Sequence, residues 1–361
     1  MIVYPLKFRE IFRPLLWGGR RLEELLGKNL PPGEKIGESW EVSDYGSNPS
    51  VVKNGPYRGQ TLRDLLQQFT TQLVGKLAWA NSPGRFPLLI KFLDASERLS
   101  LQVHPDDQYA RQHEGGQSGK TEAWYIIAAP PGAQLICGVS QNTSPQRFAE
   151  AVRDGNLEGH LYPVAVSPGD VIFLPAGRVH AVGENICLYE VQQTSDLTYR
   201  LWDWGRPREL HLEKGLAAID FHFVPDPKVE GIEISIGDNS KKYLIACRFF
   251  TVELLTVRTS FQEICDGRSF HILTVLEGEG KIFFSNGRQD IRRGESILVP
   301  ATTGTYKLTA SVPLRILKSY VPDLRQDIIL PLRDLGKSDE QICALGGQGK
   351  TNDIAPLLVG R

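Results

Sequence analysis

The sequence lacks a marked excess of charge of either sign, and it lacks long uncharged apolar runs. Its 361 residues include 41 Lys and Arg against 42 Asp and Glu, a formal net charge of −1. Nucleic-acid-binding proteins normally show a basic excess, so this balance argues against that class. No apolar run approaches the roughly 20 residues of a membrane-spanning helix, and Lys7, Arg9 and Glu10 interrupt the first segment, unlike a signal peptide. We therefore expect a cytoplasmic protein without nucleic-acid or membrane partners.

Cysteine is scarce as well. The cysteines are odd in number, scattered, and never spaced as Cys-x-x-Cys: Cys137, Cys187, Cys247, Cys265 and Cys343. This pattern fits reduced thiols in a cytoplasmic protein better than a disulfide framework or a cysteine metal site.

From residue 86 onward the sequence contains short apolar segments separated by turns rich in Gly and Pro. They read PLLIKFLDA, LSLQVH, EAWYIIAA, QLICGV, DVIFLPA and CLYEVQQ. Many short strands with regular turn signals predict a sandwich or barrel rather than a βαβ sheet. Helices are expected at 20–26, at 61–77, where leucines at 62, 65 and 66 form an apolar stripe behind a plausible N-cap, and at 144–154.

An internal repeat relates two parts of the chain. SPGDVIFLPAGRVHAV and RRGESILVPATTGTYKL share the pattern G-[DE]-x-I-hydrophobic-hydrophobic-P-A at an offset of 125 residues, from Gly169 to Gly294 and from Pro175 to Pro300. Upstream of the second copy, LTVLEGEGKIFF predicts a glycine-turned hairpin. Two related β-barrels in tandem are the simplest interpretation.

One residue of the repeat is informative because it changes. At the same offset His180 becomes Thr305, and we expect a polar interior in the first barrel but not in the second. The predicted fold is mainly β with a few helices in the N-terminal half. Its domains are a catalytic metal-binding barrel at 1–225, a second barrel without metal ligands at 226–325, and a tail at 326–361.

Four polar side chains in the predicted first barrel could share one ion. In SLQVHPDD, Gln102 and His104 stand at i and i+2 of a strand and face the same side. Buried polar groups without partners cost roughly 2–7 kcal/mol each, so these two need neighbours. Glu122 begins the strand KTEAWYII, and His180 follows the PAG turn. Two imidazoles, a carboxylate and an amide oxygen suit Zn²⁺, with Mn²⁺, Fe²⁺ or Co²⁺ as alternatives.

A simpler interpretation of Gln102 and His104 is an interior hydrogen-bonded pair, which we would favour for the QVH triplet alone. The histidine at 180, on a turn whose repeated copy lacks it, shifts the balance toward a metal. Because only one of the four ligands is charged, such a site keeps about one positive charge and room for water or substrate oxygens. That is typical of a catalytic rather than a closed structural metal site.

Several motifs together resemble the type I mannose-6-phosphate isomerases, particularly their shorter bacterial forms. They are QVHPDD, GKTEAWY, PGDVIFLPAGRVHAV and YEVQQTSDLTYRLWDWGR, in matching order and spacing, with WGG and ESWEVS near the N-terminus. The resemblance covers most of the chain. It implies tandem cupin (jelly-roll) barrels, one Zn²⁺ per chain, and interconversion of mannose 6-phosphate and fructose 6-phosphate through an enediol. It also places the zinc ligands of the family at Gln102, His104, Glu122 and His180.

The resemblance assigns further site residues. Arg200 matches the active-site arginine of the family, Lys120 matches a motif lysine, and both are expected to be catalytic. Ser100 matches a serine proposed to meet the phosphate, and Arg206 stands where fungal members carry a lysine; an arginine there can bind phosphate through two hydrogen bonds. We place Asp106 with these substrate-binding residues. The proton carrier stays open between Lys120, a metal-bound water and a carboxylate such as Asp106.

Other functions remain in view at this point. An isomerase acting on another phosphosugar differs only in pocket contacts, which motifs do not reveal. A cupin-type non-haem iron dioxygenase would prefer a histidine-rich site and consume O₂. A non-catalytic sugar-phosphate-binding module would bind without turnover. We expect a monomer or a homodimer.

Overall fold

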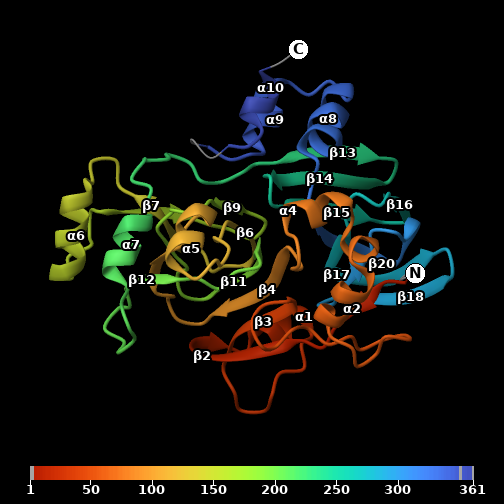
Figure 1. Ribbon diagram of the computed structural model, residues 1–361, viewed down its shortest axis with the longest axis horizontal. Helices are drawn as coiled ribbons and strands as arrows, with labels where there is room; N and C mark the ends of the chain where they lie inside the picture. The colour runs from red at the N-terminus through yellow and green to blue at the C-terminus, as the bar shows by residue number, and fades with distance from the viewer. Residues whose placement is uncertain (1–3, 349–351, 360–361) are drawn as a thin grey trace.

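The structure is a computed structural model that describes residues 4–348 and 352–359. Two β-barrels lie side by side, and the last helices pack at one end of the molecule (Figure 1). Strand pairing is antiparallel throughout the described residues. The predicted mainly β architecture is therefore confirmed. In the described part of the chain no helix is long and apolar enough to cross a membrane.

The first barrel consists of two sheets. One has the strand order β2-β3-β4-β11-β6-β9, with bounds β2 (Ile11–Gly19), β3 (Ile36–Val42), β4 (Leu88–Ala95), β11 (Ile186–Gln193), β6 (Glu122–Ala128) and β9 (Val171–Leu174). The other has the order β12-β5-β10-β7-β8, with bounds β12 (Tyr199–Trp202), β5 (Leu101–Val103), β10 (His180–Ala181), β7 (Gln134–Val139) and β8 (Leu161–Ala165). Buried side chains of both sheets, such as Trp124 and Leu135, share one apolar core.

The second barrel is built from one large sheet. Its main path runs β1-β19-β17-β20-β15-β14-β13, with β16 and β18 paired to its long strands. The bounds are β1 (Leu6–Lys7), β13 (Ile232–Ile236), β14 (Asn239–Ala246), β15 (Thr251–Val257), β16 (Ser260–Cys265), β17 (His271–Phe284), β18 (Gly287–Arg292), β19 (Ser296–Val299) and β20 (Gly304–Tyr320). Because β1 pairs with β19, the first strand of the chain completes the sheet of the second barrel. The domain boundaries at 225 and 325 stay predictions.

The helices connect and cover the barrels. Their bounds are α1 (Arg21–Leu26), α2 (Leu62–Phe69), α3 (Thr71–Val74), α4 (Lys76–Asn81), α5 (Asp107–His113), α6 (Pro145–Asp154), α7 (Leu212–Ala218), the π-helix η1 (Leu324–Ile329), α8 (Leu330–Asp334), α9 (Asp339–Ala344) and α10 (Ala355–Leu358). The helices expected at 20–26 and 144–154 are confirmed within one residue.

The single helix expected at 61–77 is wrong, because the segment contains two breaks. Its start is as predicted: Thr61 caps α2 through a capping box with Asp64, and the leucine stripe is buried. The chain then breaks at Thr70 (φ 47°) and at Gly75 (φ 92°). A Cβ at Gly75 would lie 2.2 Å from the carbonyl oxygen of Arg268. Close contact with the second barrel therefore turns the chain there, and glycine permits both the contact and the left-handed backbone.

The repeat found in the sequence is a repeated piece of structure. Its two copies form the turns into β9 and β19, and Gly169 (φ 94°) and Gly294 (φ 82°) both adopt the left-handed conformation. Each glycine donates its N–H across the turn, Gly169 to Ile126 O and Gly294 to Val275 O. The two turns therefore use the same hydrogen-bonding arrangement in the two barrels.

The expectation that only the first barrel has a polar interior is wrong. Glu253, His271 and Lys318 are buried in the second barrel, and the side chain of Glu263 is 9% exposed. Each stands at a two-residue spacing from side chains of the apolar core, so they point inward. Lys318 Nζ lies 2.7 Å from both Glu253 Oε2 and Glu263 Oε2. The substitution of His180 by Thr305 could not reveal these charges, since other strands carry them.

Candidate metal centre and catalytic cavity

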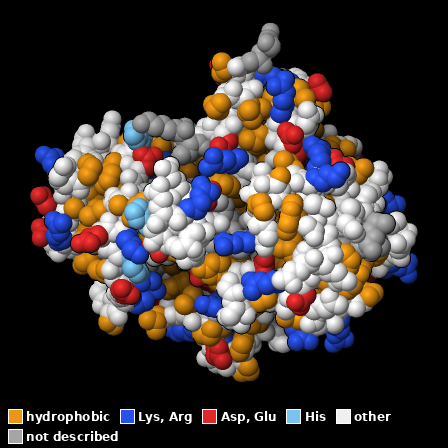
Figure 2. Space-filling model, viewed as in Figure 1, with side chains coloured by type: hydrophobic (Ala, Val, Ile, Leu, Met, Phe, Trp, Pro, Cys, Tyr) orange, Lys and Arg blue, Asp and Glu red, His pale blue; other side chains and the backbone are white. Residues whose placement is uncertain are grey.

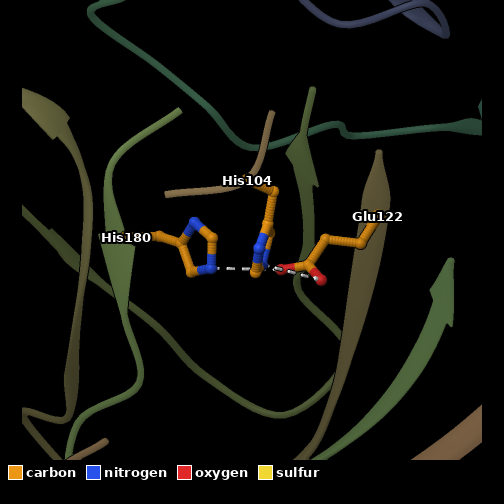
Figure 3. Close-up of side chains that lie close together, drawn as sticks. All are labelled: His104, Glu122 and His180. Atoms are coloured by element: carbon orange, nitrogen blue, oxygen red, sulfur yellow. Dashed lines mark ion pairs between the residues drawn. The ribbon is translucent and has the colours of Figure 1, made fainter. Parts of the chain in front are cut away.

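Three buried side chains from both sheets of the first barrel converge on one point (Figure 3). His180 on β10 lies opposite Gln102 on β5, His104 follows β5 directly, and Glu122 begins β6 of the other sheet. Glu122 Oε2 lies 3.5 Å from His104 Nε2, and Glu122 Oε1 lies 3.3 Å from His180 Nε2. The structure therefore brings together the residues that the sequence predicted as ligands.

Backbone carbonyls orient both imidazoles. His104 Nδ1 lies 2.7 Å from Leu197 O, and His180 Nδ1 lies 2.8 Å from Arg178 O. Since a carbonyl only accepts, each Nδ1 carries the proton, and each Nε2 presents a lone pair to the centre. Metal-binding histidines are typically fixed in this way by a second hydrogen bond.

Most of the ligand atoms lack a hydrogen-bond partner, although Lys120 Nζ forms an ion pair with Glu122 Oε2 and Gln102 Nε2 lies 3.1 Å from His180 Nε2. Among the described residues, His104 Nε2 and both carboxylate oxygens of Glu122 are buried without a hydrogen-bond partner. Leaving such groups unpaired is costly, and a divalent cation between them would satisfy all three. The donor set therefore fits a divalent metal ion, and N and O donors of this kind suit Zn²⁺.

Gln102 stands at the edge of this group. Its Nε2 lies 3.1 Å from His180 Nε2, and its Oε1 lies 3.4 Å from Ser100 Oγ. Rotating the amide by 180° exchanges the nitrogen and the oxygen with almost no change of shape. That rotation turns the carbonyl oxygen toward the centre, as a fourth ligand requires.

The electrostatics keep the ligands in the forms that bind metals. Burial raises the pKa of Glu122, but the Lys120 ammonium 3.0 Å from its Oε2 and the His104 imidazole together bring that pKa well below its ordinary value. Burial, with a further contribution from Lys120, lowers the pKa of His104 to about 3. Burial also lowers the pKa of His180. At neutral pH the carboxylate is therefore charged and both imidazoles are neutral.

A cavity of about 310 Å³ opens beside the centre. Of the predicted site residues, Ser100, Gln102, Lys120 and Arg200 line it. Arg200 is half-buried, and its Nη1 donates to Glu209 O at 2.8 Å. Its Nε is buried without a hydrogen-bond partner in the described chain.

Two predicted substrate-binding residues lie elsewhere. The guanidinium of Arg206 does not line this cavity; its Nη2 donates to Asp203 Oδ1 at 2.9 Å and to Arg98 O at 2.7 Å. Asp106 caps helix α5 by accepting from Tyr109 N, and it lines cavities at the junction of the two barrels instead. As placed here, neither side chain reaches the cavity beside the metal centre.

The structure adds cavity residues that the sequence reasoning missed. Arg208 lines the cavity, and its Nε donates to the buried Asp203 Oδ2 at 2.6 Å. Lys91 lies 3.3 Å from Glu190 Oε1, and both line the cavity. A signal for the last two was available, because each is a charge in the middle of a mainly apolar and fully buried strand, in LLIKFLDA and ICLYEVQQ. Such charges are rarely buried unless they are paired.

Two tandem cupin barrels with a His–Glu–His centre in the first define a cupin protein with a candidate catalytic metal site. Comparisons with known proteins agree. The model of the phosphomannose isomerase type I catalytic domain matches residues 6–125, and that of the mannose-6-phosphate isomerase cupin domain matches residues 239–321.

Mannose-6-phosphate isomerase ManA of Bacillus subtilis is 36% identical over 314 residues, which cover 85% of this chain and 96% of that protein. Mannose-6-phosphate isomerase of Streptococcus mutans is 33% identical over 330 residues, covering 88% of this chain and 98% of that protein. The crystal structure of mannose 6-phosphate isomerase from Bacillus subtilis superposes with a TM-score of 0.80 at 31% identity, covering 87% of this chain and 99% of that one. This chain belongs to the mannose-6-phosphate isomerase family.

Proposed function

We propose that this protein interconverts mannose 6-phosphate and fructose 6-phosphate with one Zn²⁺ held by Gln102, His104, Glu122 and His180. The observation that carries the proposal is the set of buried, unpartnered ligand atoms beside a cavity lined by cations. Membership of the family supports the same substrate pair. The expectation of a monomer or a homodimer stays a prediction.

The metal end of the cavity would handle the sugar oxygens. A divalent ion held by these four residues would act as a Lewis acid toward the negative charge that develops as the enediol forms. The carbonyl bonds to His104 Nδ1 and His180 Nδ1 keep the rings aimed at this point. Lys120 lines the cavity next to this centre.

The phosphate end would be the wall formed by Arg200 and Arg208. Both guanidinium groups line the cavity, and a guanidinium can bind two oxygens of one phosphate at once. Asp203 holds Arg208 through both carboxylate oxygens, so the arginine is oriented before substrate arrives. Ser100 adds a hydroxyl on the same side as Gln102.

Proton transfer between C1 and C2 requires a group that can both accept and donate a proton. Lys120 and Glu190 line the cavity, whereas Asp106 does not, so we assign the transfer to the first two. Burial and the charge of Glu122 raise the pKa of Glu190, which moves that carboxyl toward the neutral range where general acid–base catalysis is efficient. Lys91, 3.3 Å away, balances its charge when ionised.

The test is conversion of mannose 6-phosphate by the purified protein as isolated, after chelation, and after addition of each candidate metal. Loss on chelation and recovery with Zn²⁺ would support both the reaction and the metal. Recovery with Mn²⁺, Fe²⁺ or Co²⁺ alone would retain the reaction and reject zinc. Absence of conversion by fully zinc-loaded protein would overturn the substrate assignment, and a panel of other phosphosugars would then identify the substrate.

A further inference from the structure

A second cavity, of about 360 Å³, lies at the junction of the two barrels. It shares no lining residue with the cavity beside the metal centre. Its walls come from the end of α4, from α5 and the loop after it, and from the turn between β14 and β15. Figure 2 shows Lys and Arg side chains gathered along the middle of the face where the two barrels meet.

The charges around this cavity are unbalanced. Arg85, Arg111 and Arg248 line it. All three are exposed, and none of them forms an ion pair with a carboxylate of the described residues. Asp107 is the carboxylate in the lining, and its Oδ1 already accepts hydrogen bonds from Gly119 N and from Gln193 Nε2. The cavity lining therefore has three arginines against one carboxylate, an excess of positive charge.

Neutral donors complete the lining. Asn81, Ser82 and Ser118 also line the cavity, and their side chains form no hydrogen bond to another described residue. Unpaired guanidinium groups beside free hydroxyl and amide groups form a donor-rich surface. Phosphate groups suit such a surface, because arginine binds their oxygens through two parallel hydrogen bonds.

We propose that this junction cavity is a second anion site, which binds the phosphate of a small phosphorylated metabolite between Arg111 and Arg248. Arg111 belongs to α5 of the first barrel, and Arg248 to the β14–β15 turn of the second. Both also line the adjoining cavity of about 440 Å³, which gives space for the rest of the ligand. A bound phosphate links the two barrels.

The site also contacts the segment that carries catalytic groups. Two lining residues of the cavity accept hydrogen bonds from this segment. Asp107 Oδ1 accepts from Gly119 N, and Gln193 Oε1 accepts from Thr121 N. These two backbone groups flank Lys120, which pairs with Glu122. An anion that fixes α5 therefore also restrains the segment from which Lys120 projects. This inference does not depend on the identity of the sugar, because it concerns binding away from the metal centre.

The test uses inorganic phosphate as the probe and metal-loaded protein, at low ionic strength because salt screens exposed charges. Isothermal titration calorimetry should detect two phosphate sites per chain in the natural protein. The Arg111→Ala/Arg248→Ala double variant should retain only the site beside the metal centre. Arg200→Ala should retain only the junction site. Arg147→Ala on α6, which removes an exposed arginine remote from both cavities, should keep two.

Two further measurements keep the test decisive. The double variant should unfold at the same temperature as the natural protein without phosphate, and it should lose part of the rise in unfolding temperature that phosphate causes. Its kcat/KM for sugar phosphate, assayed without phosphate, should stay within about twofold. Two phosphate sites in the double variant, or a single site in the natural protein that Arg200→Ala removes, would overturn the proposal. Either result would leave the assignment of the reaction unaffected.

Discussion

Glu122 and His271 occupy corresponding positions in the two barrels. Glu122 lies opposite Leu174 on β9, His271 lies opposite Val299 on β19, and Leu174 and Val299 are related by the repeat offset of 125 residues. In the first barrel this position faces two neutral imidazoles and holds a candidate metal ligand. In the second it lies beside a cavity of about 200 Å³ lined by lysine and glutamate side chains. Both barrels thus have paired charges at the same end, Lys120 with Glu122 in the first and Lys318 with Glu253 and Glu263 in the second.

The first prediction concerns Glu122 as a ligand. Glu122→Gln keeps the shape of the side chain but removes its negative charge, so we expect metal retention and activity to fall together. Weaker ligation should reduce the metal affinity by at least about tenfold, since even outer partners of ligands contribute that much. Metal content after dialysis, measured by mass spectrometry alongside kcat/KM, checks this. A variant with one metal per chain and a full rate would exclude Glu122 as a ligand.

The second prediction separates the two arginines that share Asp203. Arg208 lines the catalytic cavity and Arg206 does not. Arg208→Gln should therefore raise KM for the sugar phosphate by about tenfold or more, the loss of roughly 1.4 kcal/mol of binding. Arg206→Gln is the matched control, and it should change KM several times less. A larger increase in KM for Arg206→Gln than for Arg208→Gln would restore Arg206 as the phosphate ligand that the resemblance implied.

The third prediction concerns the charged interior of the second barrel. Lys318→Met leaves Glu253 and Glu263 with one lysine fewer between them, and breaking a buried pair typically costs about 3–5 kcal/mol of unfolding free energy. Denaturant titration measures the change. Lys242→Met removes a half-buried lysine of β14 that pairs with no carboxylate of the described chain, and it should cost far less. Equal stability of the two variants would show that the interior charges contribute little.

The fourth prediction is a pH dependence of stability that originates at His271. Burial, and next the charge of Lys318, lower the pKa of His271 to about 3, whereas an unfolded histidine titrates near 6.5. Below pH 6.5 His271 therefore binds a proton in the unfolded chain but stays neutral in the folded chain. The stabilising contribution is complete above pH 6.5 and declines as the pH falls toward 3.

Between pH 7 and pH 5 this histidine should remove about 2 kcal/mol of unfolding free energy, at 1.36 kcal/mol per pH unit below 6.5. His271→Gln has no such proton to bind, so its stability should decrease by that much less over the same interval. Urea titrations at pH 7, 6 and 5 compare the two proteins. If the unfolding free energy of the two proteins falls in parallel with pH, His271 is protonated in the folded chain as readily as in the unfolded one.

The sequence by itself determined the strands, the repeat and the metal-ligand candidates, because each depends on short-range pattern. Period-two alternation places Gln102 and His104 on one face, and a glycine turn repeated at a fixed offset marks the same structure twice. The catalytic candidates Lys120 and Arg200 came from the resemblance of these motifs to those of the isomerase family. Lys91 and Glu190 could have been added, since each is a charge in the middle of a mainly apolar strand.

Only the tertiary structure decided which side chains meet across strands distant in sequence. Gly75 breaks a helical pattern because it contacts Arg268 from the other barrel, and Arg206 turns to Arg98 O while Arg208 faces the cavity. Pairing energies between segments far apart in the chain outweigh local preference at these positions. The motif that contains both arginines does not show which of them the buried Asp203 orients toward the cavity. That choice depends on packing around one carboxylate.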